Sequence, residues 1–281
     1  MIRLGVGATP CVVVDAHAHL GAAAVAGDDG GRVAALLAHM DAAGVDRACV
    51  FASAGRGSGY PEETDLLVRA AARTGGRIVP FARVHPFWGT DAEAALRRAA
   101  EDGVQGLKLH PFMDGAFMAN DATVVHPLLR VAAEYGLVVL VHSGWGWNSA
   151  PGLVADLARS FPAVTVIMGH AGRYGFHREA AVVGRDLPNL HFDVAGLATP
   201  SAVDELAAAV GPDRVLFGSD HPYTPVGFEL EKVARWSTFG PDDVALMVGG
   251  NATRLLGLDP DGAAPIRDVP KAGDSTEEVR P

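Results

Sequence analysis

Two histidines one residue apart, His17 and His19, are the first residues along the chain that can carry chemistry. They directly follow an apolar run that ends at Asp15. Side chains at positions i and i+2 of a β-strand point to the same face, so both imidazoles can contact one ion. Neutral imidazole nitrogens suit zinc, iron or manganese. A His-x-His pair on its own is weak evidence, because a structural role explains it equally well.

Three further polar residues stand at the ends of apolar runs. His142 ends one run, His170 follows another within Gly-His-Ala-Gly, and Asp220 follows a third within Gly-Ser-Asp-His-Pro. The carboxyl ends of parallel strands meet at one edge of a barrel, which is where barrel enzymes place catalytic groups. Residues that only cap helices or close loops would not align with strand ends in this way. The alignment predicts a catalytic divalent-metal site.

The segments that must position these residues alternate between short apolar runs and longer Ala-rich helical patterns, which is typical of α/β proteins with a parallel sheet. The predicted strands are Val12–Asp15, Val45–Ala52, Ile78–Val84, Val104–Leu109, Leu137–Val141, Val164–Met168, Leu190–Val194 and Val215–Phe217. The predicted helices include Arg32–Ala43, Glu62–Thr74, Asp91–Glu101, Ser201–Val210 and a closing helix Asp242–Leu256.

Periodicity alone fits a closed barrel or an open sheet, and the placement of the polar residues favours the barrel. We therefore predict a single (β/α)8 TIM barrel over residues 1–258, close to the length of about 250 residues that is typical of this fold. The segment 28–31 is predicted to be a loop. Residues 259–281 are rich in Pro, Gly and charge, which predicts a flexible C-terminal tail.

Several segments resemble the amidohydrolase superfamily, specifically the amidohydrolase-related branch that includes metal-dependent hydrolases and relatives of aminocarboxymuconate-semialdehyde decarboxylase. The matching segments are Val14–His19, Gly106–Pro111, Val139–Gly144, Gly169–His170, Phe217–Asp220 and Gly250–Leu256. The resemblance implies a (β/α)8 barrel and the metal ligands His17, His19, His142 and Asp220. In that family the aspartate at the position of Asp220 binds metal or acts as general base, and His170 would be a second-metal ligand or a catalytic residue.

Lys108 has three open roles. The segment Lys-Leu-His-Pro resembles binuclear members, in which a carboxylated lysine bridges two metals. A free ammonium would be repelled by a nearby dication and costly to desolvate, whereas a carbamate would coordinate it. Contact with a substrate carboxylate and a structural ion pair are the other two roles.

Two residues near these strand ends are candidates for substrate binding. Arg173, just beyond His170, can bind an anionic group bidentately. Trp145 lies in the Gly-rich loop after His142, where an indole can wall a pocket for a planar ligand. The expected cofactor is a divalent metal, zinc first and manganese or iron as alternatives, with one ion or two.

Charge and composition narrow the remaining possibilities. The net charge of −10, without a block of basic residues, disfavours binding to nucleic acid or anionic membranes. With only two cysteines and no long apolar segment, we expect a cytoplasmic protein without a membrane span. The expected partner is a small-molecule substrate, and a homo-oligomer remains open.

Three functions compete for this site. The first is hydrolysis of a small amide, ester or lactone by metal-activated water, with Asp220 moving the proton. The alternative is nonoxidative decarboxylation of a small aromatic or unsaturated acid, for which Arg173, Lys108 and the tryptophan loop form a suitable pocket. The second alternative, a barrel that binds without turnover, is disfavoured because such a protein has no need of costly polar groups at one barrel mouth.

Overall fold

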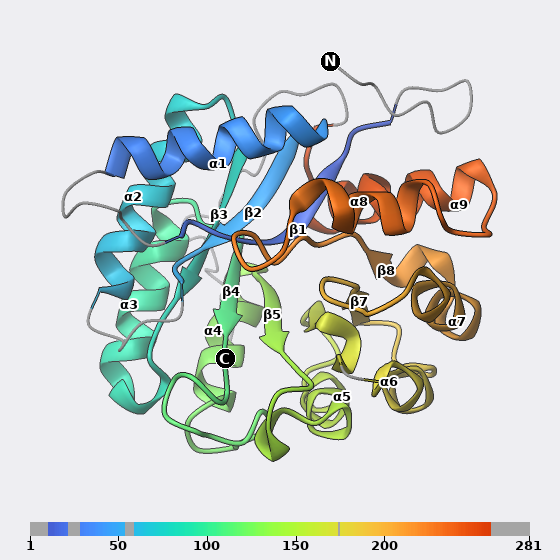
Figure 1. Cartoon of the computed structure of the whole chain (residues 1–281). Helices are drawn as coiled ribbons and strands as arrows, with labels where there is room; N and C mark the ends of the chain where they lie inside the picture. Colours follow the sequence, from blue (N-terminus) through green and yellow to red (C-terminus); the bar gives the residue numbers. More distant parts are fainter. Residues whose placement is uncertain (1–10, 22–28, 54–58, 174, 260–281) are drawn as a thin grey trace, which may run out of the picture.

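The computed structural model describes residues 11–21, 29–53, 59–173 and 175–259. Eight parallel strands form one sheet in the order β1 to β8 and alternate with helices, as Figure 1 shows. Their bounds are β1 Val14–His19, β2 Arg47–Phe51, β3 Ile78–Arg83, β4 Gly106–Leu109, β5 Val138–His142, β6 Val166–Gly169, β7 Leu190–Asp193 and β8 Val215–Leu216. All eight predicted strands are confirmed. The first continues to His19, so both histidines belong to the strand itself.

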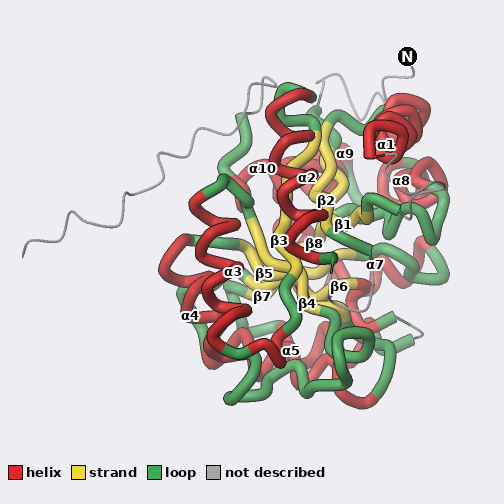
Figure 2. The backbone as a smooth tube through the Cα atoms, turned by 90° about the vertical axis from the view of Figure 1, so that its left-hand side faces the viewer, coloured by secondary structure: helices red, strands yellow, loops and turns green. Residues whose placement is uncertain are grey.

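The barrel is joined between its first and last strands. Beyond the short β8, Ala16 N donates to Phe217 O at 2.9 Å, Asp220 N to His17 O at 2.7 Å, and His19 N to His221 O at 2.7 Å. These bonds fix the segment after β8 directly against β1. Figure 2 shows the strands at the centre of the molecule with the helices around them. The prediction of a closed (β/α)8 barrel, rather than an open sheet, is therefore confirmed.

Apolar side chains cover both faces of the sheet. Inside the barrel, a buried cluster includes Val14, Cys49, Phe81, Leu140 and Leu216. A larger cluster fills the layer between strands and helices. Burial on both faces explains why the strands read as continuous apolar runs. The polar residues of the site are confined to the carboxyl ends of the strands, above this apolar interior.

The helices surround the sheet, and the four predicted crossover helices are confirmed to within three residues. The α-helices are α1 Asp29–Ala43, α2 Tyr60–Arg73, α3 Thr90–Glu101, α4 His126–Tyr135, α5 Pro151–Ser160, α6 His177–Gly184, α7 Pro200–Val210, α8 Val226–Ala234, α9 Pro241–Ala245 and α10 Asn251–Leu256. Short 3-10 turns are η1 Pro86–Trp88, η2 Trp147–Ser149, η3 His170–Gly172 and η4 Pro212–Arg214. No helix among the described residues is both long and apolar enough to cross a bilayer.

Two predictions need correction. Residues 29–31, predicted as loop, form the first turn of α1, and Asp28 lies outside the described residues. The closing helix is not uniform, because the π-helical segment η5, Leu246–Gly250, separates α9 from α10. A Cβ on Gly249 would lie 1.8 Å from Val12 O, so the helix backbone presses directly on the barrel there. The predicted flexible tail, apart from Asp259, falls outside the described residues.

Candidate metal centre and catalytic site

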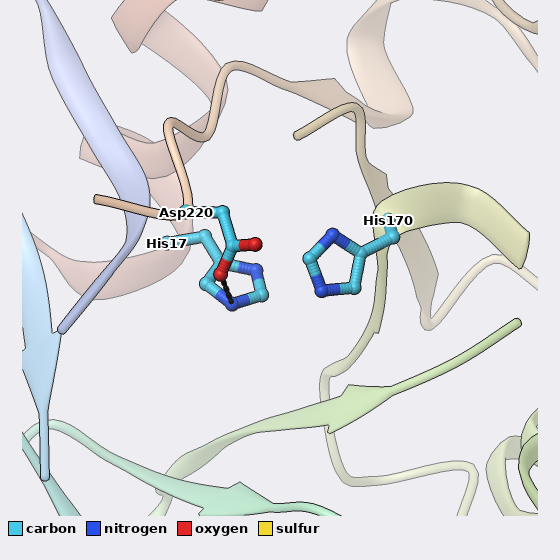
Figure 3. Close-up of side chains that lie close together, drawn as sticks. All are labelled: His17, His170 and Asp220. Carbon is cyan, nitrogen blue, oxygen red and sulfur yellow. Dashed lines mark ion pairs between the residues drawn. The ribbon is translucent and has the colours of Figure 1, made fainter. Parts of the chain in front are cut away.

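One cluster of metal-binding side chains lies at the carboxyl ends of β1, β6 and β8. His17, His170 and Asp220 are buried, and each offers a donor atom within 4.8 Å of the others (Figure 3). Asp220 Oδ1 is 3.4 Å from His17 Nε2 and 3.3 Å from His19 Nε2. One carboxylate oxygen therefore faces both imidazoles of the first strand.

Contacts of the Nδ1 atoms with neighbouring oxygens orient these two imidazoles. His17 Nδ1 lies 2.6 Å from Asp193 Oδ2, so Nδ1 donates and Nε2 keeps its lone pair toward Asp220. His19 Nδ1 faces Ala52 O at 3.4 Å, which leaves its Nε2 toward Asp220 as well. A ligating histidine usually has its second nitrogen held in this way.

Asp193 is the functional residue that sequence reasoning missed. Besides His17, it accepts hydrogen bonds from the His170 and Ala195 amides, at 3.0 and 2.8 Å. The available signal was an acidic side chain inside the apolar predicted strand Leu190–Val194. Its spacing to the other residues gave no indication of a shared site, because His17 and Asp193 are 176 residues apart in the sequence.

His142 and His170 form the other side of the site. His170 Nδ1 lies 3.0 Å from Ala195 O, and its Nε2 lies 3.1 Å from His142 Nδ1. His142 Nε2 is buried without a hydrogen-bond partner. Leaving such a nitrogen unsatisfied costs about 1–3 kcal/mol, and coordination would remove that cost. The orphaned nitrogen fits a metal ion at this mouth.

The protonation states of these donor residues also fit a bound metal ion. Burial lowers the pKa of His17, His19 and His142 well below the usual range, and it lowers the pKa of His170 to about 3. All four imidazoles are therefore neutral and able to coordinate at neutral pH. Together with the Asp220 carboxylate they suit zinc, iron or manganese. The ligand set His17, His19, His142 and Asp220 stays a prediction, and the tightest described cluster places His170 beside two of its members.

Lys108 lies inside the site. Its side chain is fully buried, with Nζ 3.1 Å from His17 Nε2 and 4.5 Å from the centre of the Phe51 ring. Burial lowers the pKa of Lys108 to about 7, against the opposing carboxylates of Asp220 and Asp193. A large fraction of the amine is therefore neutral near pH 7. A neutral amine is what carboxylation requires, and it is also tolerated beside a cation, so the bridging and substrate-binding roles both remain predictions.

Backbone strain concentrates at the same place. Five non-glycine residues of the described chain have positive φ, and four of them are His170, Ala171, Arg173 and Asp220, with φ between 41° and 62°. Gly172 has φ of 84°, so residues 170–173 form a continuous left-handed turn. Such conformations cost about 1–3 kcal/mol each and persist only where the surroundings enforce them. The side chains with predicted catalytic roles are the ones held this way.

The predicted substrate-binding residues flank the cluster. Arg173 Nη1 lies 3.8 Å from Asp220 Oδ2, on the side facing β8. On the opposite side, His110 stacks on His142 with ring centres 3.8 Å apart, and Phe112 stacks on Trp145 at 5.5 Å. Trp145 is also 6.0 Å from His142. The two stacked pairs form a wall of rings along the ends of β4 and β5, with the ring planes of His142 and Trp145 tilted by 52° to one another.

The loops after β5 and β6 touch through their backbones. A Cβ on Gly144, whose φ is 78°, would lie 2.0 Å from Gly172 O. Beside it, Ser143 Oγ donates to Gly169 O at 2.6 Å and accepts from Gly172 N at 3.0 Å. The loop that carries Trp145 is thus fixed to the turn that carries His170.

Comparison with known proteins supports this description. Residues 14–258 match the family model Amidohydro_2, described as amidohydrolase. A search of the curated proteins found no match. Among solved structures, 4-oxalomesaconate hydratase from Rhodopseudomonas palustris has a TM-score of 0.70 at 16% identity, over 88% of this chain and 96% of that one. The 2,6-dihydroxybenzoate decarboxylase from Rhizobium has 0.68 at 18%, over 89% and 99%.

A third structure contains a metal. It is 5-carboxyvanillate decarboxylase from Novosphingobium aromaticivorans, complexed with manganese and a nitrobenzoic acid. Its TM-score is 0.64 at 17% identity, over 80% of each chain. At these identities the solved structures establish the shared barrel.

Proposed function

Since the chain belongs to the amidohydrolase family, we propose that it is a metal-dependent nonoxidative decarboxylase of a small planar carboxylic acid. The sequence alone placed hydrolysis first and decarboxylation second. Two of the three similar structures described above are decarboxylases of aromatic acids, and the third is a hydratase of an unsaturated acid. These matches support the decarboxylase reading over the hydrolase.

The observation that carries this proposal is the position of Arg173. Its guanidinium lies 3.8 Å from Asp220 at the metal-binding cluster, in a segment whose left-handed backbone is costly to form. A guanidinium is always charged and binds carboxylates bidentately. A fixed cation at the reacting centre is useful when the substrate is itself an anion, and a neutral amide or lactone has no comparable need of it.

The residues of the chain divide the reaction between them. His17, His170 and Asp220, with His19 and His142 as neighbours, would hold the metal, and zinc or manganese bound there would polarise the substrate. Arg173 binds the carboxylate, while the rings of His110 and Trp145 line the pocket for the planar acid.

Asp220, next to Arg173, would relay a proton from water to the carbon that loses the carboxylate. The bond between the carboxylate carbon and the neighbouring carbon breaks, and CO2 leaves. The electron pair of that bond forms a new carbon–hydrogen bond with the proton from Asp220. The proton is restored to Asp220 from water, so no redox partner is required. Loss of proton transfer of this kind typically costs about 10²- to 10⁴-fold in rate.

The test is a substrate panel on protein loaded with zinc or manganese. Hydroxybenzoates and short unsaturated acids are assayed for release of CO2, and the corresponding amides, esters and lactones for hydrolysis. We expect turnover of at least one acid, and a loss of about 100-fold in kcat/KM for Arg173→Met. The matched control Arg178→Met, an exposed arginine on α6, should behave as wild type. Hydrolysis of a neutral substrate with no turnover of any acid would contradict the proposal and favour the hydrolase.

A further inference from the structure

A buried ion pair on α8 lies behind the site and takes no part in the chemistry described so far. Lys232 is fully buried and Glu229 is 3% exposed, and Lys232 Nζ lies 2.5 Å from Glu229 Oε2. A buried ion pair is weak evidence for stability, since apolar residues of similar volume often serve as well. Its position therefore calls for another explanation.

Both charges of this pair bind the same short stretch of backbone. Glu229 Oε2 accepts from Gly196 N at 3.0 Å, and Lys232 Nζ donates to Leu197 O at 2.7 Å. These atoms belong to residues 193–197, which we call the β7 turn. Within the β7 turn, Asp193 Oδ1 accepts from Ala195 N at 2.8 Å.

The β7 turn in turn contacts two site residues. Ala195 O lies 3.0 Å from His170 Nδ1. A Cβ on Gly196 would lie 3.3 Å from three atoms of the Arg173 guanidinium, so that guanidinium rests directly on the Gly196 backbone. With φ of 69°, Gly196 also has a backbone conformation that other residues rarely adopt. The position of the Arg173 guanidinium thus depends on where the Gly196 backbone lies.

We infer that Glu229 and Lys232 are positioning residues for carboxylate recognition, because they anchor the β7 turn on which the Arg173 guanidinium rests. This inference rests on the proposed function, and it names the residues that would give the site its specificity for a carboxylate. A bidentate contact requires the guanidinium in one orientation. A displaced β7 turn leaves the charge of Arg173 near the site and removes that orientation.

The test replaces both charges at once, so that neither partner is left buried and unpaired. Glu229→Met with Lys232→Met removes both anchors. Glu229→Gln with Lys232→Met keeps an acceptor for Gly196 N and loses the donor to Leu197 O. Glu231→Gln, an exposed position on the same helix, is the control. Binding of 4-hydroxybenzoate and of 4-hydroxybenzamide to metal-loaded protein is measured by calorimetry, with metal content and melting curves alongside.

We expect the double methionine variant to bind the acid about tenfold more weakly, as for loss of one charge-assisted hydrogen bond, and the amide within about twofold of wild type. The variant Glu229→Gln with Lys232→Met should bind the acid about threefold more weakly than wild type. If the double methionine variant does not fold, this variant serves as the test. Acid binding that stays at the wild-type level, or an equal loss for acid and amide, would overturn the inference.

Failure of the proposed function has a different signature. It appears in the wild type, as no preference for the acid over the amide. In that case hydrogen exchange across residues 193–197 decides the inference by itself. Faster exchange in the double methionine variant, with none in Glu231→Gln, supports the anchoring role, and unchanged exchange overturns it.

Discussion

The two halves of the barrel mouth are built on different principles. The polar half, formed by His17, His19, His170, Asp193 and Asp220, is held by hydrogen bonds to backbone, by the contact of His17 with Asp193, and by left-handed turns. The ring half, formed by His110, Phe112 and Trp145 beside His142, is held by stacking, and Phe112 and Trp145 are 43% and 46% exposed. The first arrangement tolerates little displacement, whereas the second can be altered one ring at a time. We therefore expect the polar half to set the chemistry and the ring half to set the substrate.

The largest effect should come from removing the first-strand pair of the polar half. The double change His17→Ala with His19→Ala is expected to abolish both metal binding and activity, because it removes two neutral nitrogen donors. Elemental analysis measures the metal, and His39→Ala, an exposed histidine, is the control. Retention of metal and turnover by the double variant would refute the metal centre.

The next effect is on proton transfer. Asp220→Asn should reduce kcat by about 10²- to 10⁴-fold at equal metal content, because an amide neither accepts nor donates that proton. Asparagine tolerates the φ of 55° at this position, so the backbone should be preserved. Turnover within about threefold of wild type would transfer the proton role to His170.

Lys108 lies between the halves, and Lys108→Ala is expected to remove most activity, by about tenfold or more. Both proposed roles, bridging metals or binding a carboxylate, require the terminal nitrogen. Recovery of the variant with bicarbonate or a short-chain acid would indicate a carbamate in the wild type. Wild-type activity in the variant would exclude both roles and leave a structural one.

A smaller effect is expected in the ring half, and it should fall on KM. Trp145→Ala removes a ring from the wall and should raise KM about fivefold while kcat stays within about threefold, as for loss of stacking worth about 1 kcal/mol. Trp147→Ala supplies a matched control, since that indole is 71% exposed and outside the wall. A fall in kcat alone for Trp145→Ala would mean that the two halves are not separable.

The last effect is on stability rather than on rate. Burial holds the pKa of Lys108 at about 7, below its usual 10.5. Between these values the unfolded chain binds more protons than the folded one, so this residue makes the stability of metal-free protein increase with pH across that window. Denaturant unfolding of chelated protein should show that increase, and Lys108→Met should lack it. Equal pH dependence in both proteins would assign Lys108 an ordinary pKa.

Sequence reasoning predicted the barrel well because strands covered on both faces leave continuous apolar runs. It also brought His17, His19, His142, His170 and Asp220 to one edge, because the ends of parallel strands must meet there. Asp193 and the Glu229–Lys232 pair were missed. Their roles depend on contacts between residues far apart in the chain or with backbone atoms, which leave no local pattern. The π-helical break at Leu246–Gly250 was missed for a similar reason, since it follows from contact with Val12.

The backbone contact between Gly144 and Gly172 has a consequence for redesign of this protein. Because even a methyl group on Gly144 would overlap the Gly172 carbonyl, the loop after β5 cannot be resculpted without moving the turn that bears His170. Insertions or random libraries in residues 143–146 should therefore yield mostly inactive proteins. Changes of substrate range are better sought by exchanging the side chains of Phe112, after β4, and Trp145, after β5, which can be varied while the backbone stays in place.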